Sequence, residues 1–335
     1  MQEVNVALLG FGNVGRAFAR YITRSSRVSG MRVRVCAVAD VTGATFLGSA
    51  EELGGLLDSE KTIGQYFPDR DLQDVPTFLR SLQKQGVSVL IECMPTDIGS
   101  GQPALTFLRA ALAEKIHVVT VDKGPMVHGW ADLTQQARRA GVRLAYSGTT
   151  GVRPPSQLTN CRVLQIQGVL NGTTNYILTE MQERSLDFHH ALANARELGI
   201  AEPDPSLDID GWDTSCKILI LANAWMNAGA SLADIYRTGI GQETESLIAS
   251  ARGLRHRVRL VGSARLYEQH VRVSVAPKLI DPESAFYSVS GTSKAAIFTT
   301  EERGDILVPA QSGRDAIAQV IAGDLAYVLT GEFPV

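Results

Sequence analysis

Short apolar runs alternate with segments of helical periodicity over the first 150 residues. The apolar runs predict strands over 4–10, 32–40, 87–92, 117–121 and 142–146, and the amphipathic segments predict helices over 13–25, 103–114 and 130–140. Apolar strands that alternate with helices are typical of a parallel sheet covered on both faces. With right-handed crossovers, this pattern predicts a doubly wound α/β fold.

The pattern changes after Gly148. A predicted strand over 163–170 precedes helices over 174–184, 187–198 and 213–227, and two strands over 259–266 and 271–279 follow them. Runs of helices followed by runs of strands indicate an α+β second domain. A last helix over 313–329 is expected to return to the first domain. We therefore predict one domain over 1–148, completed by 305–335, and a second domain over 149–304.

Glycines occupy three positions between the first predicted strand and the first predicted helix, at Gly10, Gly12 and Gly15. In such a loop the first glycine allows a tight turn, the second lets a pyrophosphate approach the backbone, and the third lets helix and strand pack closely. The helix start at Asn13 and Val14 offers N–H groups and a partial positive charge to phosphates. The loop predicts a Rossmann-type dinucleotide site, and the alternative is a turn of purely structural value.

Asp40 closes the second predicted strand at the distance expected for the acidic residue of a dinucleotide site. Its carboxylate is placed to accept hydrogen bonds from the adenosine ribose hydroxyls, which favours NAD. No Arg or Lys follows within Val41–Gly43, so a 2′-phosphate would meet a carboxylate without a compensating charge. The alternative is that Asp40 is an ordinary turn residue.

Composition excludes several classes of protein. The net charge of −3, with 44% hydrophobic and 20% charged residues, predicts neither a nucleic-acid partner nor a membrane partner. The basic run over 252–259 is interpreted as a solvated helix face rather than an RNA site. No apolar run reaches the roughly 18 residues of a membrane span, and the N-terminus does not resemble a signal peptide. Four widely spaced cysteines without a CxxC predict a reduced, cytoplasmic protein and identify no metal ligands.

Acidic residues and a lysine follow one another in the second domain. Glu202 begins a Glu-Pro-Asp-Pro segment, and Asp208, Asp213 and Lys217 come after it. Asp213 and Lys217 are four residues apart on one predicted helix and share a face. They form either a surface ion pair or, because the rest of that helix is apolar, a buried pair suited to proton transfer. Lys123, directly after a predicted strand, is either a ligand-site lysine or a solvated one.

Several segments together resemble homoserine dehydrogenase. They are the glycine loop 10–15, and 117–124, 171–177 and 197–205 with its continuation to Asp213 and Lys217. The resemblance implies oxidation of L-homoserine to L-aspartate 4-semialdehyde, or the reverse reduction, with NAD or NADP. It places the protein in threonine, methionine and isoleucine biosynthesis, and it implies a cytoplasmic homodimer whose second domain serves catalysis and dimerisation.

The resemblance also assigns roles to residues. Lys217 would exchange a proton with the reacting oxygen, Lys123 would lie between nicotinamide and substrate, and Asp213 would orient the lysine. The residues implied at the substrate are Glu202, Asp208, Gly172 and Thr173. The residues implied at the cofactor are Gly10, Gly12, Asn13, Val14, Gly15, Asp40, Met94, Pro95, Lys123 and Gly199.

Some positions depart from the family pattern. Ser147 stands where the family has a carboxylate of a monovalent cation site, which argues against sodium here. Met94 replaces a common Thr beside the cofactor, and Lys294 replaces a usual Asn. The chain ends at Val335, so no C-terminal regulatory domain and no threonine feedback through one are expected. These departures keep two alternatives open: a dehydrogenase of another amino-acid alcohol or semialdehyde, or a non-catalytic NAD sensor.

Overall fold

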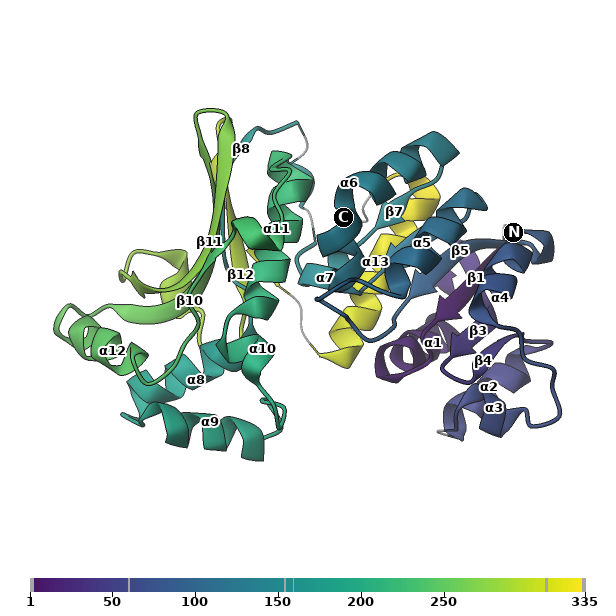
Figure 1. The fold of residues 1–335 in the computed structure, drawn as a ribbon, viewed down its shortest axis with the longest axis horizontal. Coiled ribbons are helices and arrows are strands. Elements are labelled where there is room, and N and C mark those ends of the chain that lie inside the picture. The colour runs from purple at the N-terminus through teal and green to yellow at the C-terminus, as the bar shows by residue number, and fades with distance from the viewer. Residues whose placement is uncertain (1–2, 60, 154, 159, 311–312, 333–335) are drawn as a thin grey trace. The chain divides into compact units, whose positions relative to one another are not determined.

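The computed structural model describes residues 3–59, 61–153, 155–158, 160–310 and 313–332. The chain forms two compact units, the first from 1–153 with 311–335 and the second from 154–310 (Figure 1). Within the C-terminal segment that the sequence assigns to the first domain, residues 311, 312 and 333–335 lie outside the described residues.

The first unit is built on a largely parallel sheet with the strand order β2-β3-β1-β5-β6-β7. A further strand, β4, pairs with the C-terminal part of β3. The strands are β1 (Glu3–Leu9), β2 (Arg27–Val28), β3 (Met31–Asp40), β4 (Gly43–Phe46), β5 (Val87–Glu92), β6 (His117–Thr120) and β7 (Leu144–Ala145). Strands β1, β3, β5, β6 and β7 run parallel, whereas β2 and β4 are antiparallel to β3. The predicted doubly wound fold is confirmed, and its strand order reverses between β1 and β5, where such sheets bind ligands.

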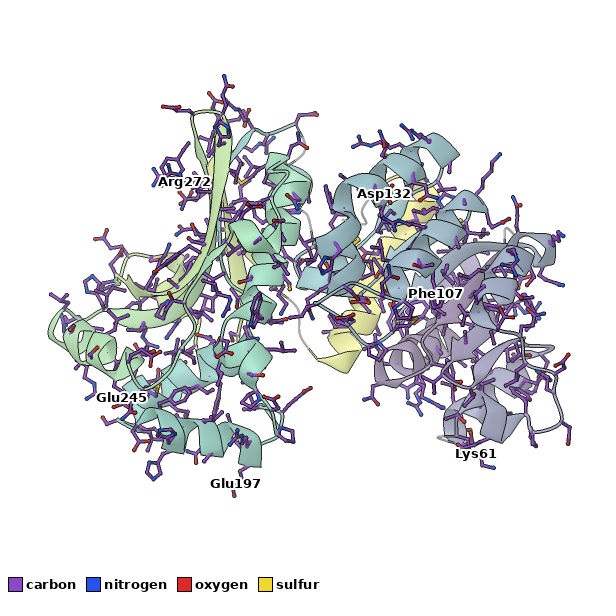
Figure 2. All side chains as sticks on the ribbon, viewed as in Figure 1. Lys61, Phe107, Asp132, Glu197, Glu245 and Arg272 are labelled. Carbon is purple, nitrogen blue, oxygen red and sulfur yellow. The ribbon has the colours of Figure 1, made fainter. Side chains whose placement is uncertain are left out.

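Helices bury both faces of this sheet. They are α1 (Asn13–Ser25), α2 (Ala50–Asp58), α3 (Ile63–Tyr66), α4 (Val75–Leu82), α5 (Ala104–Ala113), α6 (Lys123–Ala140), α7 (Ser147–Thr150) and α13 (Arg314–Thr330). Val4, Val6 and Leu8 of β1 share one core with α1, α2 and α13, while Ala7 and Leu9 are buried on the opposite face. Helices α4, α5 and α6 pack in succession. Asp132 of α6, labelled in Figure 2, forms an ion pair of 2.6 Å with Arg109 of α5.

Helix α6 begins seven residues earlier than the sequence predicts, at Lys123 instead of residue 130. Asp122 caps it by accepting a hydrogen bond from Gly124 N at 2.8 Å. Pro125 and two glycines hide the helical periodicity, but a proline is tolerated in the first turn because its N–H would have no partner there. Lys123 therefore lies on the first turn of a helix and not in a loop.

The second unit combines helices with a mostly antiparallel six-stranded sheet of order β13-β12-β8-β10-β11-β9. Its strands are β8 (Val163–Val169), β9 (Tyr236–Arg237), β10 (Arg257–Tyr267), β11 (His270–Ile280), β12 (Ala295–Thr300) and β13 (Gly304–Pro309). Its helices are α8 (Gly172–Glu183), α9 (Phe188–Glu197), α10 (Ser206–Ile209), α11 (Trp212–Met226) and α12 (Thr244–Gly253). Helix α11 packs across β8, β10 and β11, as the predicted α+β arrangement requires. Among the described helices none is both long and apolar enough to cross a membrane.

The basic run over 252–259 is not a solvated helix face, so that interpretation is wrong. Arg252 ends α12, the chain turns at Arg255 with φ +57°, and β10 begins at Arg257. Arg257 pairs with Glu183 at 2.9 Å, and Arg259 is fully buried. The run therefore divides its charges between a helix end, a turn and a strand.

Candidate active site

The glycine turn of the first unit is tightly packed at two of its three glycines and open at the third. Gly10 has φ +99°, and a Cβ on it would lie 2.6 Å from the carbonyl carbon of Cys93. A Cβ on Gly15 would lie 2.2 Å from Gly10 O, so both positions require glycine. At Gly12, by contrast, no atom of the described residues lies within 4 Å of a built Cβ, and no side chain caps α1. Open space beside an uncapped helix start fits the dinucleotide implied by the sequence.

Arg16, which the sequence analysis missed, fastens this turn to α2. Its Nε donates to Phe11 O at 3.2 Å and one Nη donates to Leu56 O at 2.8 Å, while the guanidinium lies over the Phe11 ring. A second Nη donates to Lys61 O. Asn13 and Val14 form the first turn of α1 next to it. The only sequence signal for Arg16 is its place directly after Gly15.

Asp40 lies at the end of β3, as predicted, and its carboxylate already has backbone partners. One oxygen accepts from Thr42 N at 2.8 Å, and the other accepts from Ile63 N at 2.7 Å, at the start of α3. The turn role that the sequence left open is therefore real. The first oxygen also accepts from the Thr42 hydroxyl, so the second one, Oδ2, is the oxygen that keeps a lone pair for a ribose hydroxyl.

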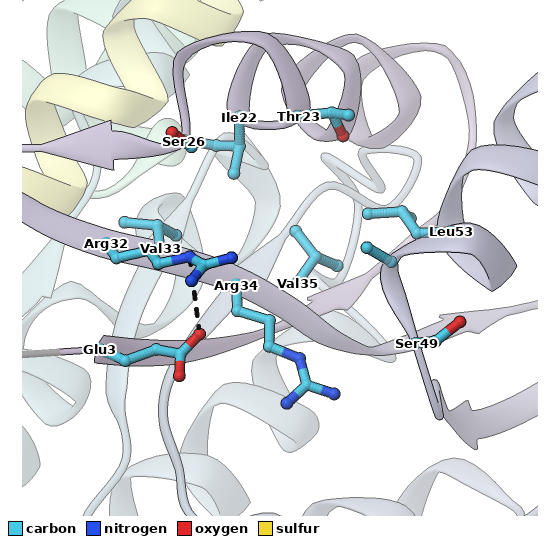
Figure 3. Close-up of a pocket in the computed structure, with 11 residues that line it drawn as sticks. Glu3, Ile22, Thr23, Ser26, Arg32, Val33, Arg34, Val35, Ser49 and Leu53 are labelled. Carbon is cyan, nitrogen blue, oxygen red and sulfur yellow. Dashed lines mark ion pairs between the residues drawn. The ribbon is translucent and has the colours of Figure 1, made fainter.

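A cavity of about 380 Å³ lies toward the beginning of β3 (Figure 3). Its lining includes Arg32 and Arg34, and Arg32 Nε lies 3.9 Å from Glu3 Oε1. Arg34 and Asp40 are six residues apart, which is about 20 Å along a strand. This cavity is therefore separate from the glycine turn.

Buried acids join the carboxyl ends of β5 and β6. Glu92 is fully buried, and its carboxyl accepts from Met94 N at 2.7 Å and from Thr120 Oγ1 at 2.5 Å. Burial, reinforced by the neighbouring Asp122 carboxyl, raises the pKa of Glu92 to about 8. Burial also raises the pKa of Asp122, which caps α6 beside Lys123. Met94, with Pro95 after it, and Lys123 thus lie directly beside these buried acids in the chain, at the strand ends.

The second unit holds the lysine and aspartate that the sequence places four residues apart. Lys217 Nζ donates to Asp213 Oδ2 at 2.6 Å and to Leu170 O at 2.9 Å. Both charged side chains are only 12% exposed, so the surface ion-pair interpretation is wrong. An ammonium has three N–H donors, and these two contacts leave one for a substrate oxygen.

Asn171 connects this pair to another predicted acid. Its Nδ2 donates to Asp208 Oδ1 at 2.6 Å and to Asp213 Oδ2 at 2.9 Å. Gly172 begins α8 against the backbone of Thr292, and Thr173 Oγ1 donates to Ile200 O at 3.1 Å. The structure therefore brings most of the predicted substrate residues of this unit to one place.

Two predicted residues are not in that hydrogen-bond network. Glu202 is exposed, and among the described residues it shows no hydrogen bond to Asp208, Asp213 or Lys217. Gly199 lies in the second unit with φ +67°, where its N–H donates to Arg196 O at 3.0 Å and ends α9. Their proposed contacts with substrate and cofactor stay predictions.

Hydrogen bonds within the first unit hold the segment around Ser147. Ser147 N donates to the buried Asp324 at 2.8 Å, and Ser147 O already accepts from Gly151 N at 2.9 Å. The Thr150 hydroxyl lies 3.4 Å from both Ser147 O and Val152 O, where it competes with an ion for those oxygens. We therefore assign no step of the reaction to a cation here.

Comparison with known proteins identifies the family. Residues 155–326 match the family model of homoserine dehydrogenase, and residues 10–147 match that of the homoserine dehydrogenase NAD binding domain. The homoserine dehydrogenase of Methanocaldococcus jannaschii is 29% identical over 97% of this chain and 98% of its own length. The NAD(+)-dependent homoserine dehydrogenase of Pseudomonas canavaninivorans is 31% identical over 98% of this chain and 97% of its own length. This chain belongs to the homoserine dehydrogenase family.

Solved homoserine dehydrogenases share the fold. The enzyme from Thiobacillus denitrificans is similar with a TM-score of 0.80 and 26% identity, over 98% of this chain and 73% of that one. A hyperthermophilic archaeal homoserine dehydrogenase in complex with NADPH has the same TM-score of 0.80 and 26% identity, over 99% of both chains. The chain is an NAD(P)-dependent homoserine oxidoreductase of amino-acid biosynthesis, which confirms the resemblance seen in the sequence.

Three further groups of this homoserine dehydrogenase, besides Arg16, were missed by the sequence analysis. Glu92 and Asp122 each stand at or just after the end of a buried apolar strand, which is a weak signal for a functional acid. Asn171 begins a segment that the sequence analysis quotes for the family, but only its neighbours Gly172 and Thr173 were singled out. Its role is visible only once α8, α10 and α11 are in place.

Proposed function

We propose that Lys217 exchanges the proton of the homoserine C4 hydroxyl. The observation that carries this assignment is the buried Lys217–Asp213 pair, in which Asp213 and Leu170 O hold the ammonium and one donor remains. In the reducing direction the ammonium donates its proton to the aldehyde oxygen. In the oxidising direction the neutral amine accepts the hydroxyl proton.

The remaining chemistry is a hydride transfer, which the nicotinamide supplies when the cofactor is bound. In the oxidising direction a bound nicotinamide would take the hydride of the C4–H bond, and Lys217 would take the O–H proton. We assign Asp208, Glu202, Gly172 and Thr173 to substrate binding. The carboxylates of Asp208 and Glu202 match the α-ammonium of an amino acid. Lys123 is assigned to the nicotinamide end of the substrate.

We propose NAD as the preferred cofactor. The glycine turn binds the pyrophosphate, and Met94, Pro95 and Gly199 complete the assigned contacts. Asp40 accepts from the ribose diol, while a 2′-phosphate at that place would be repelled by the carboxylate. Val41, the next residue, is 96% exposed and carries no charge to compensate.

We propose that the enzyme is a cytoplasmic homodimer. Gly262 of β10 faces Ile218 of α11, so Arg265, at odd spacing from it, lies on the other face of the sheet. That outer face has a hollow of about 500 Å³, where Arg265 and Arg272 lie over the Tyr267 ring. Arg272 is labelled in Figure 2. Such a face suits a second copy, which sedimentation analysis would detect. None of the four cysteines forms a disulfide, in keeping with a reducing compartment.

The proton-transfer assignment is tested by Lys217→Ala. The appearance of NADH is followed with L-homoserine, in parallel with NAD and NADP. We expect turnover to fall by at least ~100-fold in the variant, with cofactor affinity kept. The matched control is Lys84→Ala at an exposed lysine of the first unit, which should behave as the wild type. Near-wild-type turnover in Lys217→Ala would remove Lys217 from the reaction.

A further inference from the structure

Asn171 stands between β8 and α8 with its side chain held in one orientation. It is the N-cap of α8, and its Oδ1 accepts from Thr174 N at 2.8 Å and from Thr174 Oγ1 at 3.1 Å. Asn171 as a whole is only 5% exposed. Because Thr174 N can only donate, it requires the carbonyl oxygen, and the amide nitrogen must point the opposite way.

The amide nitrogen points at two carboxylates that come from different helices. Its hydrogens go to Asp208 Oδ1 on α10, at 2.6 Å, and to Asp213 Oδ2 on α11, at 2.9 Å. Asp213 Oδ2 is the same oxygen that accepts from Lys217 Nζ. One amide therefore bridges the two acids and shares an acceptor with the lysine.

This bridge answers an electrostatic problem. Two carboxylates that converge on one nitrogen repel each other, and the repulsion is strong where water is largely excluded. An amide supplies two N–H donors without adding charge, whereas a second lysine would compete with Lys217 for Asp213. Each hydrogen bond from Asn171 therefore keeps one acid in place and leaves the charge of the Lys217–Asp213 pair unchanged.

We propose that Asn171 is a positioning residue for the proton transfer: it fixes Asp208 and Asp213 relative to each other and so aims Lys217 at the reacting oxygen. It acts through Asp213 and does not touch the reacting atoms. The inference rests on the proposed role of Lys217. Loss of the bridge should therefore slow the chemical step and weaken the positioning of the substrate, while binding of the cofactor is unaffected.

The test uses two substitutions that keep the helix cap. Asn171→Asp has nearly the same size and retains an oxygen for Thr174 N, but it replaces the two donors by a third carboxylate. Asn171→Ser also retains a capping oxygen and removes the donors without adding charge. Ser, Asp and Asn are all strong N-caps, so the stability of α8 should change little. The control Asn194→Asp makes the same charge change on α9.

We expect kcat with L-homoserine to fall at least tenfold in both variants and further in Asn171→Asp. The KM for NAD should stay within twofold of the wild type, and Asn194→Asp should keep its kcat. A merely structural residue would not split the two constants in this way. A kcat within threefold of the wild type in Asn171→Ser, or a KM for NAD that rises as far as kcat falls, would overturn the proposal.

Thermal melting separates misfolding from misplacement. If Asn171→Asp does not fold, Asn171→Ser alone decides, because it carries no extra charge. The failure of this inference differs from that of the proposed function. An inactive Lys217→Ala together with fully active Asn171 variants would refute only the bridge, whereas an active Lys217→Ala would refute the assignment on which the bridge depends.

Discussion

Each unit of this homoserine dehydrogenase holds a pair of neighbouring acids, and the two pairs are neutralised in different ways. In the first unit Glu92 is fully buried beside Asp122, and burial raises its pKa to about 8, so it carries a proton at neutral pH. In the second unit Asp208 and Asp213 share the Asn171 amide, and Asp213 pairs with Lys217 at 2.6 Å.

The difference follows from the donors that each site offers. Glu92 receives hydrogen bonds from one backbone N–H and one hydroxyl, and these do not offset the cost of burying a charge. Asp213 receives hydrogen bonds from an ammonium and an amide, and these offset that cost. A pair neutralised by a proton is suited to holding strand ends together. A pair neutralised by a lysine retains a proton that can be exchanged with substrate.

Replacing an acid by its amide should therefore have a severe effect on activity in the second unit. In Asp213→Asn, Lys217 loses its charged partner, and the one amide oxygen that remains is a neutral and weaker acceptor, so the lysine is less firmly oriented. We expect kcat to fall by roughly 10- to 100-fold with little change in the KM for NAD. Steady-state assays with L-homoserine check this. A kcat close to that of the wild type would mean that the pair is structural, as the Glu92 pair is.

A third acid, Asp40, sharpens the comparison because backbone N–H groups hold it and it is not enclosed. Asp40→Ser keeps a hydrogen-bonding group at the cofactor but removes the charge that disfavours a 2′-phosphate. The ratio of kcat/KM with NAD to that with NADP should fall by about tenfold, which corresponds to ~1.4 kcal/mol. The two cofactors are compared in parallel at fixed L-homoserine. An unchanged ratio would restrict Asp40 to the turn role that it has with Thr42 and Ile63.

Glu92→Gln should have the smallest effect on activity, because glutamine resembles the protonated acid. We expect kcat within about threefold of the wild type at pH 7, in contrast to Asp213→Asn. The variant should instead alter how stability depends on pH.

The sign follows from the raised pKa. The folded-state pKa of Glu92 is about 8 and its ordinary value is 4.5, so the stability that this group contributes is complete below pH 4.5 and is lost as the pH rises through 8. The glutamine of the variant would not titrate. The melting temperature of the variant relative to the wild type should therefore increase from pH 5 to pH 9, by roughly 2–4 °C for each kcal/mol. Parallel melting curves that keep the same separation at both pH values would contradict a protonated Glu92.

The sequence alone determined much of the first unit. Periodicity located α1 and β5 with their observed ends, and the spacing of Gly10, Gly12 and Gly15 located the turn between β1 and α1. These predictions succeed because a buried parallel strand and the helix after it impose local patterns on adjacent residues. The segments that resemble the family likewise pointed to Lys217 and Asp213 without knowledge of their surroundings.

Only the tertiary structure decided how the charged residues are used. The sequence could not distinguish a surface pair from a buried one at Asp213 and Lys217, since exposure depends on the sheet packed against α11. It gave no role to Glu92 or Asn171, because their partners are distant in the chain. Thr120 lies 28 residues from Glu92, and Asp208 and Asp213 lie 37 and 42 residues from Asn171. Hydrogen bonds between distant segments leave no periodic trace in the chain, so the partners that neutralise each buried acid appear only when the elements are packed together.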